Sequence, residues 1–232
     1  MTDTFHYKHT TLGVLGGMGP ITSAQFIKTI YQLCQETDEY SMPRVRLVSE
    51  PDIPDRTTSI KASDTTLLES RLCSLLERMV PDVDKILICC FTAHALVPGF
   101  PDDIRKKLIN LVTYSDQLLR QLDKKTLFIA SEGVHEVELF PLAHYENVVM
   151  LRREDRKTAH QLIYDHLKKG ANYDHVEKSL FALLDAYNCT QIFGGCTDIH
   201  LLKMWDGLTL NIVDPLYEIA SEFAGRLSQV NE

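Results

Sequence analysis

The chain has 232 residues, of which 44% are hydrophobic and 24% charged, a composition typical of a globular protein with a sizeable core. Its formal net charge of −8 leaves no surplus of lysine and arginine for phosphates, so we do not expect it to bind nucleic acid. No apolar run approaches the ~20 residues that cross a bilayer, and the polar start MTDTFHYKHT lacks a signal-peptide core, which predicts a cytoplasmic protein that does not bind membranes.

Short apolar or β-branched runs alternate with longer segments of helical periodicity, which predicts an α/β fold with mostly parallel sheets. Strands are expected at 11–15, 44–49, 85–89, 126–130, 147–151 and 191–194. Helices are expected at 23–35, 65–79, 156–169 and 175–187, where apolar residues recur every three or four positions. A last helix is expected from Pro215, a favoured residue of the first turn, to about residue 228.

Two segments share one pattern of strand, cysteine loop and helical continuation: ILICCFTAH near position 90 and QIFGGCTDIH near position 196. This weak repeat predicts two pseudo-symmetric lobes, each a mostly parallel sheet flanked by helices. We expect residues 1–112 and 213–232 to form the N-terminal lobe, completed by the returning C-terminal helix, and 113–212 to form the second lobe. The chain is expected to cross between the lobes in the polar stretch 113–125. Because ligands bind outside the carboxyl ends of such strands, both cysteine loops should face one cleft.

The loop GGMGP at 16–20 follows the first strand and opens the first helix, where small residues let a ligand approach backbone N–H groups. A tight turn alone would use the same glycines. The loop has neither the third glycine of the dinucleotide fingerprint nor the Gly-Lys-Ser/Thr ending of a P-loop, so we expect no NAD or ATP.

Cysteine usage points to reduced thiols, because a chain of this length without a secretory signal rarely builds a disulfide framework. Cys90 and Cys196 each follow an apolar strand and precede a threonine near a helix start, where the helix dipole favours a thiolate. Cys89 should point away from its neighbour Cys90. The others are expected to be packing residues: Cys34, Cys73 and Cys189. No cysteine or histidine spacing suits zinc, and we expect no metal.

Five motifs, read together, carry a resemblance to a known family. They are LGVLGGMGP (12–20), PDIPDRT (51–57), CCFTAH (89–94), LIYDHLKKG (162–170) and GGCTDI (194–199). In this order and spacing they resemble the aspartate racemase branch of the aspartate/glutamate racemase superfamily. The similarity runs from Thr11 to the final helix, nearly the whole chain.

The resemblance implies an enzyme that racemises an amino acid without pyridoxal phosphate or any other cofactor. Removing a weakly acidic Cα proton and replacing it with inversion requires a base on each face of the carbon. By motif, Cys90 and Cys196 are this pair, one a thiolate while the other is a thiol. Members of the family often form homodimers. The implied partner is a small amino acid, with aspartate preferred and glutamate as the alternative.

The resemblance also assigns the substrate grip. It implies that the distal carboxylate of the substrate is bound by Arg56 of the PDRT segment and by Lys168 of Y-x-x-x-K. The planar guanidinium of an arginine can hydrogen-bond both carboxylate oxygens. The further candidates for substrate contact are Thr92, Thr197, Ser131, Met18 and Gly17. Three residues are candidates for tuning the thiols: Asp198 and His200 beside Cys196, and His94 behind Cys90, where a structural hydrogen-bonding histidine is the alternative.

Two positions depart from the family pattern. Phe91 stands where the family has asparagine after the first cysteine, and Val134 stands where the second lobe has threonine. A lost polar partner in a buried site costs ~1–3 kcal/mol, so the substrate could be altered. Two alternatives stay open: a related isomerase or racemase with a non-standard substrate, and a catalytically silent protein that binds an acidic metabolite. Which cysteine serves which enantiomer is not decided by the sequence.

Overall fold

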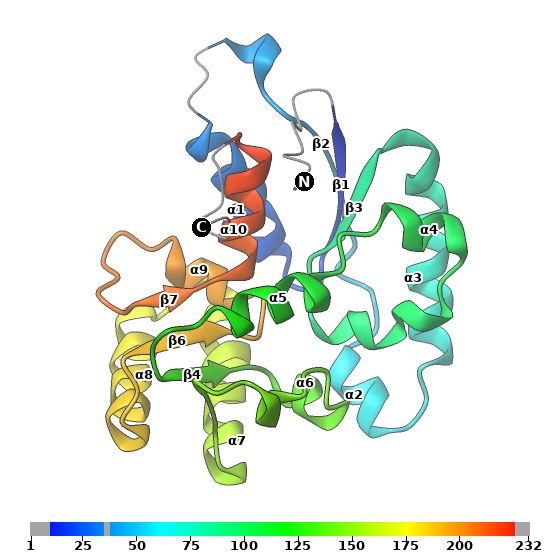
Figure 1. The fold of residues 1–232 in the computed structure, drawn as a ribbon. Coiled ribbons are helices and arrows are strands. Elements are labelled where there is room, and N and C mark those ends of the chain that lie inside the picture. The colour runs from blue at the N-terminus through cyan, green and yellow to red at the C-terminus, as the bar shows by residue number, and fades with distance from the viewer. Residues whose placement is uncertain (1–9, 35–37, 226–232) are drawn as a thin grey trace.

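The apolar runs expected as strands form two parallel sheets in the computed structural model, which describes residues 10–34 and 38–225 (Figure 1). The first sheet has the order β2-β1-β3, with β1 at Thr11–Gly16, β2 at Arg44–Ser49 and β3 at Lys85–Ile88. The second has the order β5-β4-β6-β7, with β4 at Thr126–Ile129, β5 at Val148–Met150, β6 at Gln191–Gly194 and β7 at Ile212–Val213. Together with the helices that cover them, the sheets define the first and second lobes.

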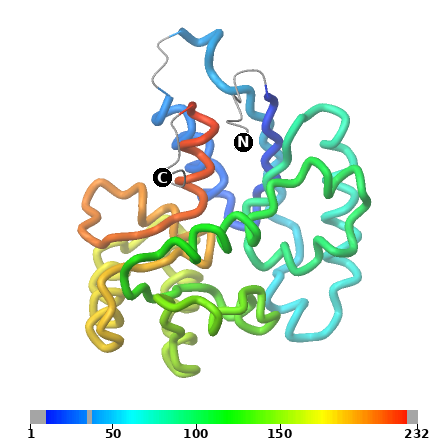
Figure 2. Tube along the Cα trace, viewed as in Figure 1, coloured from blue at the N-terminus to red at the C-terminus, as the bar shows by residue number. Residues whose placement is uncertain are grey.

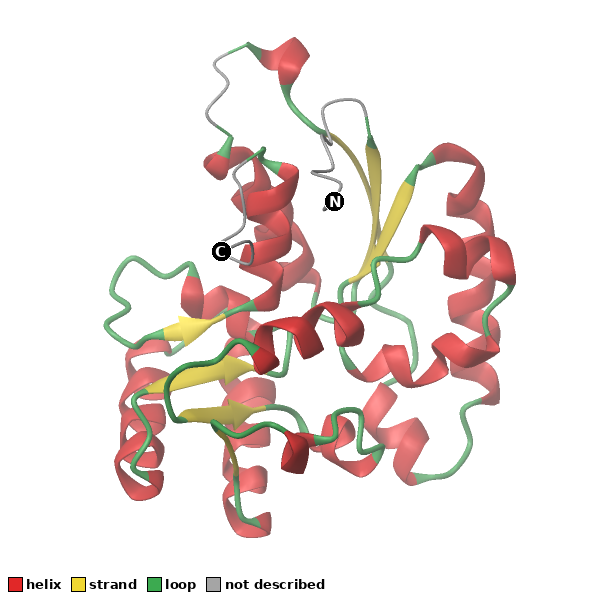
Figure 3. Cartoon of the chain, viewed as in Figure 1, coloured by secondary structure: helices red, strands yellow, loops and turns green. Residues whose placement is uncertain are grey.

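The two lobes repeat one topology, which confirms the predicted pair of similar α/β lobes (Figure 3). In each sheet the earliest strand lies in the middle, with the second strand on one side and the third on the other. The cysteine loops follow β3 and β6, the corresponding third strands. The sequence did not predict β7, whose two residues pair with Ile192 and Phe193 of β6.

Helices cover both sheets. They are α1 at Pro20–Leu33, α2 at Arg56–Lys61, α3 at Thr66–Met79, α4 at Asp102–Lys107, α5 at Leu111–Arg120, α6 at Glu132–Glu136, α7 at Arg153–Gln161, α8 at Tyr173–Tyr187, α9 at Ile199–Lys203 and α10 at Pro215–Phe223. Shorter 3₁₀ segments are η2 at Glu39–Ser41, η3 at Val80–Asp82, η4 at Thr92–Gly99, η5 at Leu142–His144 and η7 at Leu167–Lys169, and η6 at Leu162–His166 is a π-helix. In the described chain no helix is long and apolar enough to cross a membrane.

The core has three layers because strand residues alternate between faces. On β1, Leu12 and Val14 belong to a central cluster that also takes in Phe128 of β4, so this layer joins the lobes. The alternate residue Leu15 packs under α3 in an outer cluster of the first lobe. A third cluster, which includes Ile129, fills the outer side of the second lobe under α7 and α8.

The connections between the lobes are helical. Where the sequence predicted a polar crossing, the structure has α5, whose buried Leu111, Leu118 and Leu119 join the central cluster. At the other end of the chain, α10 packs beside α1 (Figure 2). The predicted end of α10 near residue 228 lies outside the described residues, as does residue 35 at the expected end of α1.

The single helix expected at 156–169 is wrong in detail. The chain leaves α-helical geometry at Leu162, makes a π-helical turn, tightens to a 3₁₀ turn at Leu167–Lys169 and stops at the left-handed Gly170. π-helical turns in longer helices are frequent at functional sites. This one carries Tyr164.

Candidate active site

A narrow cleft lies between the lobes at the carboxyl ends of the strands, where loops from both sheets meet. The first lobe contributes Met18, Arg56, Cys90, Phe91 and Thr92, and the second contributes Ser131, Tyr164, Lys168, Cys196, Thr197 and Asp198. The loops after β3 and β6 thus bring the two cysteines of the repeat to one place, as parallel strands in two facing sheets allow.

Both cleft cysteines are buried, with 7% of Cys90 and 9% of Cys196 exposed. Cys89 belongs to the central core cluster while Cys90 packs with the outer cluster of the first lobe, so the neighbours point to opposite sides. The thiol of Cys196 donates a hydrogen bond of 3.7 Å to Oδ2 of Asp198.

Cys196 lies in surroundings that favour the thiol. Burial, followed by the negative charge of Asp198, raises the pKa of Cys196 well above its ordinary value, and the Lys168 cation only partly opposes this. Burial also raises the pKa of Asp198, against the charge of Lys168 and a 2.5 Å hydrogen bond from Thr22 Oγ1. Thr22 lies on α1, so this bond joins the lobes.

Arg56 begins α2 and is only 6% exposed. Its Nη atoms donate to the backbone oxygens of Met18 at 3.0 Å, Pro54 at 3.2 Å and Ile53 at 3.4 Å, while its buried Nε has no partner. Burial opposes the guanidinium charge, yet the nearby Cys90 and Asp55 outweigh it and raise the pKa of Arg56. A fixed cation therefore lies beside Cys90.

Lys168 and Tyr164 reach the cleft from the second lobe. The Lys168 Nζ lies 4.0 Å from the centre of the Tyr164 ring, a cation–π contact that orders a half-buried side chain. Tyr164 was not predicted as a site residue, although its position four residues before Lys168 was a signal, because residues at that spacing share a helix face.

Hydroxyl groups also meet across the cleft. Thr92 Oγ1 lies 3.5 Å from Ser131 Oγ of the opposite lobe. Thr197 Oγ1 donates to the backbone oxygen of Cys89 at 3.4 Å. The three predicted hydroxyl residues and Met18 are thus brought together around the cysteines.

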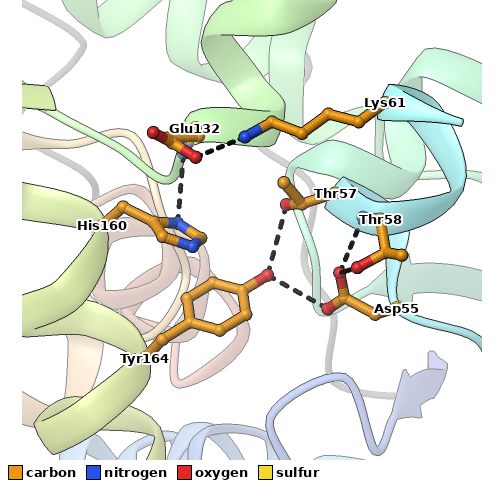
Figure 4. A network of polar contacts seen from close by, with 7 residues as sticks. All are labelled: Asp55, Thr57, Thr58, Lys61, Glu132, His160 and Tyr164. Carbon is orange, nitrogen blue, oxygen red and sulfur yellow. Dashed lines mark hydrogen bonds and ion pairs between the residues drawn. The ribbon is translucent and has the colours of Figure 1, made fainter. Parts of the chain in front are cut away.

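An interlobe latch closes the rim of the cleft (Figure 4); we use this name for Asp55, Thr57 and Lys61 of the first lobe with Glu132, His160 and Tyr164 of the second. The Tyr164 hydroxyl lies 3.1 Å from Asp55 Oδ2 and 3.2 Å from Thr57 Oγ1. Lys61 pairs with Glu132 at 2.5 Å, and the Glu132 backbone N–H donates to His160 Nδ1 at 3.3 Å.

The lobes touch closely behind the latch. A Cβ atom at Gly133 would lie 2.5 Å from Thr57 Oγ1, which explains a glycine on this face of α6. Only about 10 Å³ of the cleft is open to the centre of a water molecule, room for about one water. An amino acid therefore fits only if the cleft widens.

Three predicted site residues lie outside the cleft lining. Gly17 has φ of 90°, and a Cβ there would lie 2.3 Å from the backbone of Glu50, so this glycine serves the turn. The His200 ring lies between Asp214, whose Oδ2 is 2.5 Å from Nδ1, and Thr29, whose Oγ1 is 2.9 Å from Nε2.

His94 lies behind Cys90 as the third of these residues. The backbone N–H of Leu111 donates to its Nε2 at 3.2 Å, so the proton of the neutral ring is on Nδ1, which donates to the backbone oxygen of Cys90 at 2.8 Å. Burial lowers the pKa of His94 to about 4. The ring therefore ties the cysteine loop to the start of α5.

The two departures from the family pattern pack together. The Phe91 ring meets Phe140 edge to face at 5.6 Å, and Phe91, Phe140 and Val134 belong to the same central cluster. Phe91 is 2% exposed and Val134 is 3% exposed. Both apolar residues therefore belong to the central core cluster, and Phe91 also lines the cleft.

Among the described residues, no group of three or more His, Cys, Asp and Glu side chains is placed to hold a metal ion. None of the six cysteines, all of which lie in the described part of the chain, forms a disulfide.

Comparisons with known proteins match this architecture. A family model described as Asp/Glu/Hydantoin racemase matches residues 15–221. The fold is similar to that of Picrophilus torridus aspartate racemase, at 16% identity over 95% of this chain and 96% of that one, with a TM-score of 0.76. It is similar to an aspartate racemase homologue from Pyrococcus horikoshii OT3, at 14% identity over 94% and 100%, TM-score 0.62. A glutamate racemase from Francisella tularensis in complex with D-glutamate gives 17% identity over 94% and 79%, TM-score 0.57.

Proposed function

The chain belongs to the Asp/Glu/Hydantoin racemase family, whose members are isomerases that work without pyridoxal phosphate, and from this premise we propose that it racemises an acidic amino acid with Cys90 and Cys196 as the two bases. The observation that carries the proposal is the meeting of these two thiols, from corresponding strands of two lobes, at one cleft. A planar carbanion intermediate between two such groups can be protonated from either face.

The reaction needs only proton transfers. The thiolate of one cysteine takes the Cα proton, so the Cα–H bond breaks, an S–H bond forms, and the electron pair stays on the substrate. The thiol of the other cysteine then delivers its proton to the opposite face and becomes the thiolate. The high pKa of Cys196, caused by burial and by Asp198, supports Cys196 as the thiol in the resting enzyme. Cys90, which lies beside Arg56, is the other base of the pair.

Two cations support an acidic substrate. Arg56 and Lys168 lie on opposite lobes and both line the cleft, so a substrate with a second carboxylate would neutralise charge that is otherwise poorly solvated. We propose aspartate as the preferred substrate and glutamate as the second.

One observation favours a second candidate function. Phe91 presents an aromatic residue in the cleft lining where the family has a polar one, which supports a racemase for a less polar amino acid. Both candidates use the same pair of thiols.

The test is incubation of purified protein with L-aspartate, L-glutamate and L-leucine in deuterium oxide, following deuterium at Cα and the chirality of the product. We expect deuterium and D-product from aspartate, with no added cofactor and with chelator present. Turnover of leucine alone would support the second candidate. Binding of aspartate without exchange would contradict both and identify a silent binding protein.

We also propose that residues 1–112 with 213–232 form one domain and 113–212 the other, supported by the packing of α10 on α1. A cytoplasmic location is supported by six cysteines without a disulfide among them, as is usual for proteins of a reducing compartment. A homodimer remains part of the proposal, and sedimentation velocity tests it.

A further inference from the structure

The second lobe has another cavity, separate from the cleft. It has a volume of about 400 Å³, within the range of small-molecule sites. It lies on the other side of α6 from the cleft: Ser131 lines the cleft, whereas Val134 and His135, three and four residues later, line this cavity. We call it the α6 pocket.

The lining of the α6 pocket is apolar with a few polar groups, the usual composition of a ligand site. Its lining residues are Val134, His135, Glu138, Phe140, Pro141, Leu142, Ala143, His144, Met150 and Arg156. Val134, Phe140 and Leu142 are buried, and Met150 is 43% exposed at the opening.

Two polar groups of the pocket have hydrogen-bonding atoms that the protein does not use. Nε2 of His135 is buried and makes no hydrogen bond, an arrangement that costs free energy unless a ligand completes it. Arg156 uses its Nε on the backbone oxygen of Leu151 at 2.9 Å, and none of the ion pairs of the described residues includes Arg156. Its remaining guanidinium donors are available to an anion.

The charge state of these groups defines the ligand. Burial, and then the Arg156 charge, lower the pKa of His135 to about 4, so His135 is neutral near pH 7. The pocket then carries one cation beside one neutral side chain, a match for a single carboxylate. Glu138 is the opposing charge, and it is exposed to water at the rim, where solvent screens it.

We propose that the α6 pocket is a second ligand site, which binds a small carboxylate with an aryl or alkyl body. The carboxylate lies against the Nη atoms of Arg156, with the neutral His135 side chain in the same wall, and the apolar body packs against Phe140 and Leu142. The site is independent of the proposed racemase reaction. It is joined to the cleft by one shared wall, because the Phe140 ring also packs against Phe91.

The test is a calorimetric titration with phenylacetate, compared with its neutral amide phenylacetamide and with acetate, which lacks the apolar body. We expect one saturable site for phenylacetate, and at least ~10-fold weaker binding of both comparison probes, about 1.4 kcal/mol or more. Equal affinity for phenylacetamide would overturn the carboxylate assignment.

Variants locate the site. Arg156→Gln should weaken phenylacetate binding at least ~10-fold, whereas Lys157→Gln, the exposed neighbour on α7, should not change it. Met150→Glu places a negative charge at the opening and should weaken phenylacetate binding as Arg156→Gln does. This second variant keeps the test valid if Arg156→Gln does not fold. Arg56→Ala changes the cleft and not the α6 pocket, so it should leave phenylacetate binding unchanged. Binding that survives Arg156→Gln and Met150→Glu but is lost in Arg56→Ala would overturn the proposal.

Discussion

Unequal charges surround the two cleft thiols. Asp198 and burial keep Cys196 protonated, whereas Arg56 lies beside Cys90. In the proposed two-base reaction one cysteine starts as the thiol, and this asymmetry favours Cys196 for that role. Arg56 can serve in this way because three backbone oxygens hold it in place.

Substitution of either cation should lower activity, but only substitution of Arg56 should also lower stability. Lys168→Met should lower kcat/KM for aspartate ~100-fold or more, as for loss of one partner of a desolvated charge pair, with little change in Tm. Arg56→Met should lower kcat/KM as strongly and also lower Tm, because the buried oxygens of Met18 and Pro54 lose their donor. Steady-state kinetics and thermal unfolding measure both effects. Lys169→Met, at the exposed neighbour, is the matched control. Equal kcat/KM values for Lys169→Met and Lys168→Met would contradict substrate binding by Lys168.

Phe91 is the residue that most directly tests substrate choice. Because its ring packs against Phe140 in the core, Phe91→Asn should cost about 3 kcal/mol or more of unfolding free energy, by lost packing and a buried amide. We expect no gain in aspartate turnover. Phe91→Leu, which stays apolar, should keep most of the stability. Unchanged stability together with faster aspartate turnover in Phe91→Asn would show that the ring obstructs a polar site.

His94 should make stability depend on pH. Its pKa is about 4 in the folded chain against an ordinary 6.5, so its contribution is complete above about pH 6.5 and is lost as pH falls through about 4. The loss amounts to at most roughly 3 kcal/mol. Urea denaturation from pH 7 to pH 4.5 should show a flatter profile for His94→Gln. His135→Gln should remove a further part of the pH dependence of the unfolding free energy, because burial also lowers the pKa of His135 to about 4. A profile for His94→Gln as steep as that of the wild type would refute this origin.

The sequence predicted the positions of some site residues and not of others. The motifs selected Cys90, Cys196 and Lys168, all of which line the cleft, because each has a fixed relation to a strand end or a helix. Gly17 and His200 could not be placed, since a turn against Glu50 and a pairing with Asp214 are tertiary contacts with no local signal.

The π-helical turn between α7 and η7 sets the geometry of the rim. It presents Tyr164 to Asp55 and Thr57 while Lys168 packs over the Tyr164 ring. A regular α-helix was the prediction because its apolar spacing is regular, and a π turn leaves no mark in that spacing. Long helices such as α3 were predicted closely, whereas short ones such as α2 and α6 contain too few residues for a period to be read.

Removal of one hydroxyl from the latch should favour the open cleft. Tyr164→Phe loses the contacts to Asp55 and Thr57, worth about 1–1.5 kcal/mol, so opening should increase up to ~10-fold. Iodoacetamide should then alkylate Cys90 and Cys196 faster, as followed by mass spectrometry. Tyr187→Phe is the control, since its hydroxyl bonds Asp155 and the backbone of Arg152 within one lobe. Equal alkylation rates in the two variants would contradict a role of the latch.

The two lobes act together because the chain joins them at several levels. The central core cluster contains strand residues of both sheets, α10 returns to pack on α1, and the hydrogen bond from Thr22 to Asp198 crosses the cleft. The repeat of a cysteine loop after the third strand of each sheet predicted this arrangement from sequence. The close fit of the lobes could not be predicted, since it depends on contacts such as that of Gly133 with Thr57.

The central claim is that one thiol acts from each side of the substrate, and the direct measurement is Cα deuterium exchange by Cys90→Ser and Cys196→Ser with each enantiomer of aspartate. Serine is too weak an acid to replace either group efficiently. Each variant should therefore lose racemisation, while its remaining cysteine still exchanges a proton with the substrate on its own face. We predict exchange from one enantiomer in one variant and from the opposite enantiomer in the other. Full racemisation by either variant, or exchange of the same enantiomer by both, would contradict the account.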